Sequence, residues 1–210
     1  MSVTGCNVEI LNPNGSKTMF FLGGGTVTSG GIAIFPLSQH ADYTEFVTTA
    51  QAAGWKIIAI SGEDYPDYYE MVISAHVAEY AKQGTKPILV GHSAGGMVGL
   101  FYAKDCPSDS FFDTITLFNV PLIYPYTDNL LFQRVYDGVE RITANLTIIM
   151  SQNDPLMTWK LGNFTMTNAI EAVQNSNEKI NVQIIDQAGY QHSPFAPTDI
   201  AWKIIGHSVV

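Results

Sequence analysis

The sequence predicts a compact α/β fold, in which a mostly parallel, twisted sheet carries helices on both faces. Short apolar stretches typical of buried strands alternate along the chain with stretches of helical spacing. Hydrophobic residues make up 46% of the 210 residues, which is enough for a sizeable core. The sequence shows no internal repeat and no Pro/Gly-rich linker, so we expect a single domain over 1–210.

The first elements are two short strands. Residues 7–11 are apolar enough for a strand, and the turn residues at 12–15 end it. A second strand over 17–22 leads directly into Gly23-Gly24-Gly25. We expect a long loop over 26–39, because glycines interrupt its apolar residues.

The next elements are a helix, a strand and a longer helix. Asp42 and Glu45 are typical of a capping box, and Gly54 ends the helix that follows them. An apolar strand is expected over 55–60. Residues 65–83 have apolar side chains at helical spacing and predict the longest helix.

The second half of the chain continues the alternation. The segment 120–143 carries prolines and tyrosines, and predicts either a short lid over a binding cleft or an ordinary crossover with a helix at 129–142. The remaining elements follow from the same spacing rules: strands over 88–90, 113–119, 145–150 and 181–186, and helices over 97–103 and 165–175 and from Pro197.

The clearest chemical signal is the sequence Gly91-His92-Ser93-Ala94-Gly95, between an apolar strand and a helix rich in small residues. Gly-x-Ser-x-Gly in this setting predicts a sharp strand-to-helix turn, because a Cβ at either glycine would clash with the flanking elements. Such a turn exposes the Ser93 hydroxyl at the edge of the sheet and at a helix N-terminus. The alternative is an ordinary βα turn that contains a serine.

A reactive serine needs a base, and the base needs a group that holds its tautomer. Sites in open α/β sheets form at the carboxyl ends of the strands. Asp154 follows the strand 145–150, although an Asp-Pro turn would look the same. His192 follows the last strand, although it could be an ordinary surface histidine. The other histidines are less well placed: His40, His76, His92 and His207.

The chain order Ser93, Asp154, His192 is that of the α/β-hydrolase triad. With its Gly-x-Ser-x-Gly turn, the chain resembles the α/β-hydrolase superfamily of serine esterases, lipases and thioesterases from about Met19 to Ile205. The resemblance implies the α/β-hydrolase fold and a nucleophilic Ser93. It covers almost the whole chain and indicates the chemistry far better than the substrate.

The resemblance also implies an oxyanion hole. The first donor in the family is the N–H of the residue after the nucleophile, which is Ala94 here. The second comes from a loop after an early strand, where this sequence has Gly23-Gly24-Gly25 without the histidine that is common there. We expect Gly25 to be the second donor, with Gly24 as the alternative.

These features predict a serine hydrolase that cleaves a small or medium carboxylic ester through an acyl-enzyme on Ser93. A thioesterase or acyltransferase would use the same triad. A lyase or cofactor-free peroxidase on this fold would use it without a lasting acyl-enzyme. A non-enzymatic binding module would lack a triad member. We expect the substrate to contact Tyr124, Tyr126, Met157 and Phe195.

Composition excludes several other classes. The net charge of −9 argues against nucleic acid and anionic membrane surfaces as partners, so we expect a small acyl ester or thioester as the partner. No metal-ligand spacing is present, and no helix follows the triple glycine at dinucleotide-binding spacing, so neither a metal nor a cofactor is expected. Without a signal peptide or a membrane-spanning segment we expect a cytoplasmic protein. Cys6 and Cys106 are expected to be free thiols, with one bridge as the alternative.

Overall fold

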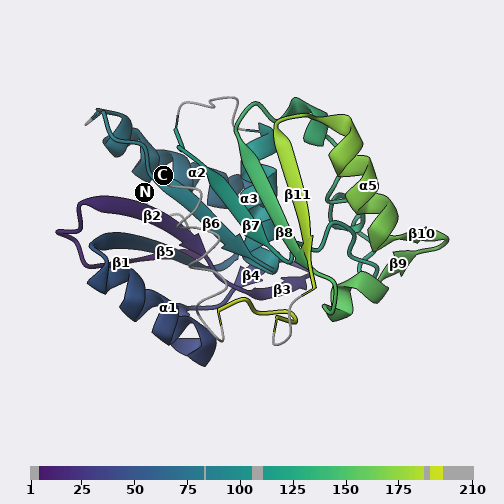
Figure 1. Ribbon diagram of the computed structural model, residues 1–210, viewed down its shortest axis with the longest axis horizontal. Helices are drawn as coiled ribbons and strands as arrows, with labels where there is room; N and C mark the ends of the chain where they lie inside the picture. The colour runs from purple at the N-terminus through teal and green to yellow at the C-terminus, as the bar shows by residue number, and fades with distance from the viewer. Residues whose placement is uncertain (1–4, 83, 106–110, 187–189, 196–210) are drawn as a thin grey trace.

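The computed structural model describes residues 5–82, 84–105, 111–186 and 190–195 (Figure 1). Parallel strands form the centre of the sheet in the order β11–β8–β7–β6–β2–β5. Their bounds are β2 (Lys17–Leu22), β5 (Trp55–Asp64), β6 (Ile88–His92), β7 (Ile115–Phe118), β8 (Leu146–Ser151) and β11 (Ile180–Ile185). The predicted mostly parallel sheet is therefore confirmed, and its carboxyl edge lies where β6, β7 and β8 end.

The N-terminal side of the sheet is antiparallel. β5 pairs with β1 (Cys6–Leu11) along residues 57–62 and with β4 (Gly31–Ile34) along 62–64. β4 pairs in turn with β3 (Gly25–Thr28). The expectation of a loop over 26–39 is therefore wrong, because a hairpin occupies most of it and the 3₁₀ turn η1 (Leu37–Gln39) follows. These short strands depend on pairing with the extended end of β5, which lies outside their own sequence.

Two hydrophobic cores lie on opposite faces of the sheet, because successive side chains of a strand point to opposite sides. Phe20 and Leu22 of β2 pack in the larger core, whereas Met19 and Phe21 pack in the smaller one. The larger core takes residues from α2 (Pro66–Lys82), α3 (Ala94–Asp105) and α5 (Met166–Ser176), and the smaller core takes them from α1 (Ala41–Ala52). Helices thus cover both faces, as predicted (Figure 1).

The segment 120–143 packs along α3 and is less helical than predicted. Only α4 (Leu130–Gln133) and the 3₁₀ turn η2 (Val139–Arg141) form in place of the helix at 129–142. Gly138, at φ 84°, precedes η2 in a left-handed conformation that breaks helical geometry. The buried ammonium of Lys104 donates to the carbonyls of Val135 (3.0 Å) and Asp137 (3.1 Å), which holds this irregular backbone on α3. A lid in this segment stays a prediction.

The structure adds one small unit that the sequence did not indicate. After β8, the 3₁₀ turn η3 (Pro155–Thr158) leads into a hairpin of β9 (Lys160–Leu161) and β10 (Phe164–Thr165). Cys6 carries a free thiol, whereas Cys106 and the helix expected from Pro197 lie outside the described residues. Among the helices that the structure describes, none is long and apolar enough to cross a membrane.

Candidate active site

The turn between β6 and α3 places Ser93 in a strained conformation. Its φ is 53°, in the left-handed region that non-glycine residues rarely adopt, and its N–H donates to the Phe118 carbonyl at 2.9 Å. The flanking glycines make this turn possible. A Cβ on Gly95 would lie 2.2 Å from the Leu22 carbonyl oxygen, and one on Gly91 would lie 2.9 Å from a carbonyl oxygen of α3. The strain points the Ser93 hydroxyl out of the turn at the carboxyl edge of the sheet.

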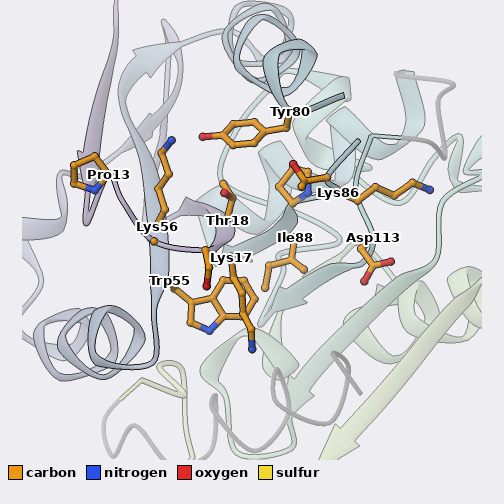
Figure 2. A pocket seen from close by; sticks show the side chains of 13 residues that line it. Pro13, Lys17, Thr18, Trp55, Lys56, Tyr80, Lys86, Ile88 and Asp113 are labelled. Atoms are coloured by element: carbon orange, nitrogen blue, oxygen red, sulfur yellow. The ribbon is translucent and has the colours of Figure 1, made fainter. Parts of the chain in front are cut away.

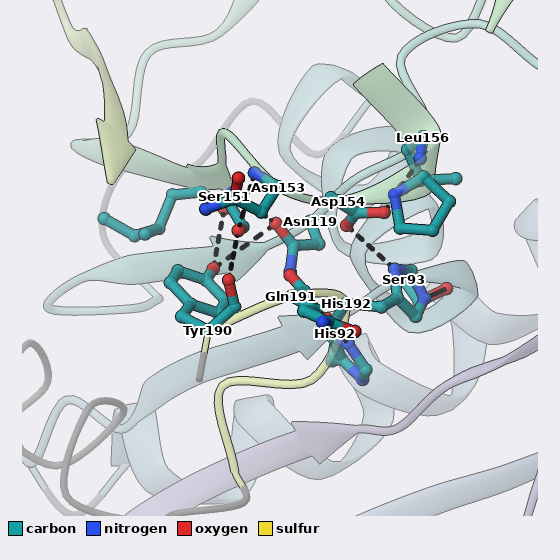
Figure 3. Close-up of polar contacts among 12 residues, drawn as sticks. His92, Ser93, Asn119, Ser151, Asn153, Asp154, Leu156, Tyr190, Gln191 and His192 are labelled. Carbon is teal, nitrogen blue, oxygen red and sulfur yellow. Dashed lines mark hydrogen bonds and ion pairs between the residues drawn. The ribbon is translucent and has the colours of Figure 1, made fainter. Parts of the chain in front are cut away.

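The structure brings the predicted acid and base to this hydroxyl. His192 Nε2 lies 2.9 Å from Ser93 Oγ, and His192 Nδ1 lies 2.8 Å from Asp154 Oδ2. Asp154 is only 2% exposed, and its Oδ1 accepts a hydrogen bond from the Leu156 N–H at 2.8 Å (Figure 3). Both carboxylate oxygens are therefore held, which fixes the orientation of the acid toward the imidazole. The geometry is that of a nucleophile, base and orienting acid.

The glycine-rich loop after β2 distinguishes Gly25 from Gly24. The Gly24 N–H already donates to the Tyr43 hydroxyl at 2.6 Å. Gly25 pairs with Ile34 across the hairpin, and the Phe35 N–H donates to the Gly24 carbonyl at 3.0 Å. This pattern makes Gly25–Ile34 a pair without mutual hydrogen bonds, so the Gly25 N–H points away from β4. The Gly25 N–H is therefore not used in the β3–β4 pairing, whereas the Gly24 N–H is already bonded to Tyr43.

A mostly apolar cavity of about 390 Å³ opens beside the serine. Ser93 and His192 line it, together with Gly25 and Ala94, and its apolar wall is formed by Val27, Met97, Pro121, Tyr124, Leu156 and Trp159. Trp159 was not among the residues expected from the sequence. It lies in the short unit after η3, where no motif points to a binding role.

The four predicted substrate contacts have different positions. Tyr124 lines the cavity. Tyr126 is 71% exposed and packs edge-on against Trp159 at 5.2 Å, so it lies at the rim. Met157 packs against the larger core instead. Phe195 is fully buried in the smaller core, so it lies on the opposite face of the sheet from this cavity.

A second cavity, of about 460 Å³, lies at the amino ends of β2, β5 and β6 (Figure 2). Lys17 and Lys56 line it and lie over the rings of Trp55 (5.4 Å) and Tyr80 (5.1 Å). Its described lining residues include one serine, Ser16, but no histidine that could act as a base for it. Ser93, His192 and Asp154 lie at the opposite, carboxyl edge of the sheet.

Buried polar residues hold the loop that carries His192, and sequence reasoning missed them. Asn119 Nδ2 donates to the carbonyls of Gln191 (3.0 Å) and His192 (2.5 Å), while its Oδ1 accepts from the Ser151 N–H (2.7 Å). Ser151 Oγ donates to the Tyr190 carbonyl at 2.5 Å (Figure 3). Asn119 follows β7, and Ser151 ends β8. A polar residue directly after an apolar strand, at the carboxyl edge, was the signal available for both.

The other histidines have different surroundings from those of His192. The His92 ring lies on the face of the smaller core, where it packs edge-on against Phe195 at 5.4 Å. Burial, and repulsion by His192, lower the pKa of His92 to about 3. The His92 imidazole is therefore neutral, and its nitrogens contact Tyr43 Oη (2.7 Å) and the His192 carbonyl oxygen (2.8 Å). His40 and His76 lie outside the apolar cavity, and His207 is outside the described residues.

Comparisons with known proteins identify the fold. No family model and no curated protein matches the sequence. Solved structures match over nearly the whole chain. A Pyrococcus furiosus esterase has a TM-score of 0.65 at 14% identity, with 97% of this chain and 86% of that chain covered. The thioesterase domain from the curacin biosynthetic pathway has a TM-score of 0.63 at 9% identity, with 98% and 95% covered.

A third structure is described as an α/β hydrolase. It comes from the metagenome of sediments from the lagoon of Mar Chica, Morocco, and has a TM-score of 0.62 at 12% identity, with 96% of this chain and 93% of that chain covered. This chain therefore has the α/β-hydrolase fold. Among the described residues, no group of three or more His, Cys, Asp or Glu side chains could hold a metal ion.

Proposed function

We propose that this protein is a serine hydrolase that cleaves carboxylic esters with small or medium acyl groups. The observation that supports it most directly is the hydrogen-bonded series from Ser93 Oγ through His192 (2.9 Å) to Asp154 (2.8 Å), beside an apolar cavity. The volume of about 390 Å³ is near the lower end of the range for small-molecule sites, which favours acyl groups of limited length.

In the first half-reaction, Ser93 Oγ attacks the acyl carbon while His192 Nε2 accepts its proton. The buried carboxylate of Asp154 stabilises the imidazolium that forms. Negative charge develops on the carbonyl oxygen, and the N–H groups of Ala94 and Gly25 donate hydrogen bonds to it. Each such donor contributes on the order of 3 kcal/mol to the transition state. His192 then gives the proton to the leaving alkoxide, which departs as the alcohol.

In the second half-reaction, water attacks the acyl-enzyme while His192 takes a proton from it. His192 returns this proton to Ser93 Oγ as the tetrahedral intermediate collapses, which releases the acid and restores the Ser93 hydroxyl. A thioester would react by the same steps with a thiolate as the leaving group, and an acyltransferase would replace water by another alcohol. The thioesterase domain that shares this fold makes the thioester the second candidate substrate.

The decisive experiment measures hydrolysis of p-nitrophenyl acetate, butyrate, octanoate and palmitate, and of matched thioesters, by the purified protein. We expect Ser93→Ala to abolish turnover with an unchanged circular dichroism spectrum. Ser176→Ala is the matched control, because Ser176 lies exposed at the C-terminal end of α5 and bonds only its own helix. A fluorophosphonate is expected to label Ser93, as read by peptide mass spectrometry.

Retention of most of the ester hydrolysis in Ser93→Ala would refute the assignment. Faster turnover of the thioesters than of their oxygen counterparts would identify the protein as a thioesterase. A protein that is not labelled at Ser93 would contradict covalent catalysis and favour the lyase or peroxidase alternatives.

A further inference from the structure

A buried hydrogen-bond path joins the glycine-rich loop to the loop that carries His192. The Gly24 N–H donates to Tyr43 Oη at 2.6 Å, and Tyr43 Oη lies 2.7 Å from His92 Nδ1. His92 Nε2 lies 2.8 Å from the His192 carbonyl oxygen. This path of four residues thus begins beside Gly25 and ends on the backbone of His192.

The chemistry of its ends fixes the direction of every bond in the path. The His192 carbonyl can only accept, so His92 Nε2 carries the hydrogen. Because burial keeps the His92 imidazole neutral, its Nδ1 has no hydrogen and accepts from the Tyr43 hydroxyl. Burial also raises the pKa of Tyr43, which keeps the phenol protonated. Its oxygen is then free to accept the Gly24 N–H, and every donor in the path meets an acceptor.

Both ends of the path belong to the site. Holding the Gly24 peptide on Tyr43 sets the direction of the next amide, that of Gly25, which is the predicted oxyanion donor. Holding the His192 carbonyl sets the backbone from which its imidazole reaches Ser93. Asn119 also donates to this carbonyl, so the loop keeps one anchor when His92 is changed.

Packing alone does not require these polar contacts. The Tyr43 ring packs edge-on against Phe21 (5.1 Å) and Phe195 (5.2 Å), and a phenylalanine would fill the same space. Instead a hydroxyl and an imidazole are buried here, which is favourable only when both are hydrogen-bonded. Neither Tyr43 nor His92 lines the apolar cavity, so neither is expected to contact the acyl group.

We propose that Tyr43 and His92 are positioning residues, which together hold the Gly25 amide and the His192 imidazole at the separation that acyl transfer requires. This inference rests on the proposed serine hydrolase function. It predicts an effect on kcat rather than on KM, because the two residues act on groups that bind the transition state and leave the acyl cavity unchanged.

The first test is Tyr43→Phe, which removes one oxygen atom and keeps the ring. We expect kcat for p-nitrophenyl butyrate to fall about 10-fold or more, because small displacements of catalytic groups have large effects, while KM stays within about twofold. Tyr80→Phe is the matched control. Its ring is also buried and packs edge-on against a β2 phenylalanine, Phe20 at 6.1 Å, but it lies at the amino edge of the sheet. An unchanged kcat in Tyr43→Phe would overturn the inference.

The second test compares two replacements of His92. The side-chain amide of His92→Gln can donate to the His192 carbonyl in place of Nε2–H, whereas His92→Leu cannot. We expect the glutamine variant to retain kcat within about threefold and the leucine variant to lose about 10-fold or more. The losses in Tyr43→Phe and His92→Leu are expected not to add in the double variant, because both interrupt one path. Equal losses of kcat in the two His92 variants, or additive losses of kcat in the double variant, would overturn the inference.

The third test needs no activity. Nitrogen-15 NMR of the imidazoles is expected to show His92 as the Nε2–H tautomer throughout the neutral pH range, in the wild-type protein and in Ser93→Ala. The Nδ1–H tautomer would overturn the inference while leaving the proposed function intact. A wild-type protein with the expected tautomer but without activity on any ester or thioester would overturn the function, and the positioning role with it.

Discussion

Gly95→Ala tests the close contact between α3 and β2 on which the serine turn depends. The added Cβ would lie 2.2 Å from the Leu22 carbonyl oxygen and 2.4 Å from that of Gly23, whereas ordinary contact begins at 3.4 Å. Because both atoms belong to backbone, α3 or the end of β2 must move by about 1 Å to relieve the overlap. The Gly95 N–H also donates to the Gly23 carbonyl at 3.0 Å, so this bond would be strained as well.

The expected effect on activity exceeds the effect on stability. Ser93 directly precedes α3 and Gly25 lies three residues after β2, so the displacement changes the separation between the predicted nucleophile and the predicted oxyanion donor. A misplacement of about 1 Å lowers catalysis roughly 100-fold. Overpacking of this kind destabilises by about 1 to 3 kcal/mol, which for a chain of this size lowers Tm by roughly 2 to 12 °C.

The assay is kcat/KM for p-nitrophenyl butyrate together with Tm, measured beside Gly99→Ala. Gly99 lies one helical turn further along α3. Its Cβ would overlap the end of the Leu117 side chain, at 2.7 Å, and would make an ordinary contact with Leu89 at 3.7 Å. The Leu117 side chain can move, and alanine favours the helix by about 1 kcal/mol, so we expect activity within about threefold of wild type. If Gly95→Ala were as active as Gly99→Ala, the proposed coupling between this contact and the site would be refuted.

Two further variants test the histidine loop and the acid–base balance of the fold. Asn119→Gly keeps the left-handed backbone (φ 46°) but loses both bonds to the His192 loop, so we expect about 2 to 4 kcal/mol lower stability and about 10-fold lower kcat. The control Asn12→Gly, also left-handed (φ 48°) and bonded to a backbone carbonyl far from the site, is expected to lower Tm and leave kcat unchanged, and a similar loss of kcat in it would contradict the assignment. Burial, with repulsion from Asp105, raises the pKa of Glu70 from 4.5 to about 7. The folded state thus binds more protons than the unfolded chain between these values, and stability falls as pH rises through them. Glu70→Gln is therefore expected to raise Tm at about pH 8 and to raise it much less at about pH 4. An equal rise in Tm at both pH values would argue against this interpretation.

The sequence by itself determined the α/β class and predicted three side chains of the site, Ser93, Asp154 and His192. The elbow around Ser93 is a local pattern, in which an apolar strand, two closely packed glycines and a small-residue helix are adjacent in the chain. Asp154 and His192 could be found because parallel strands end at one edge of the sheet, so residues that follow different strands become neighbours. Their catalytic roles stay predictions until the Ser93 variants are measured.

Only the tertiary structure decided the parts that depend on partners far along the chain. The β3–β4 hairpin forms because the end of β5 offers it a partner, and the segment 120–143 follows the surface of α3 rather than its own helical spacing. The hydrogen-bond partners of Asn119 and His92 likewise cannot be predicted from their neighbouring residues, since each bonds a loop more than 70 positions away. Hydrophobic periodicity reports which face of an element is buried, whereas the partner of a buried polar group depends on which distant backbone the fold brings beside it.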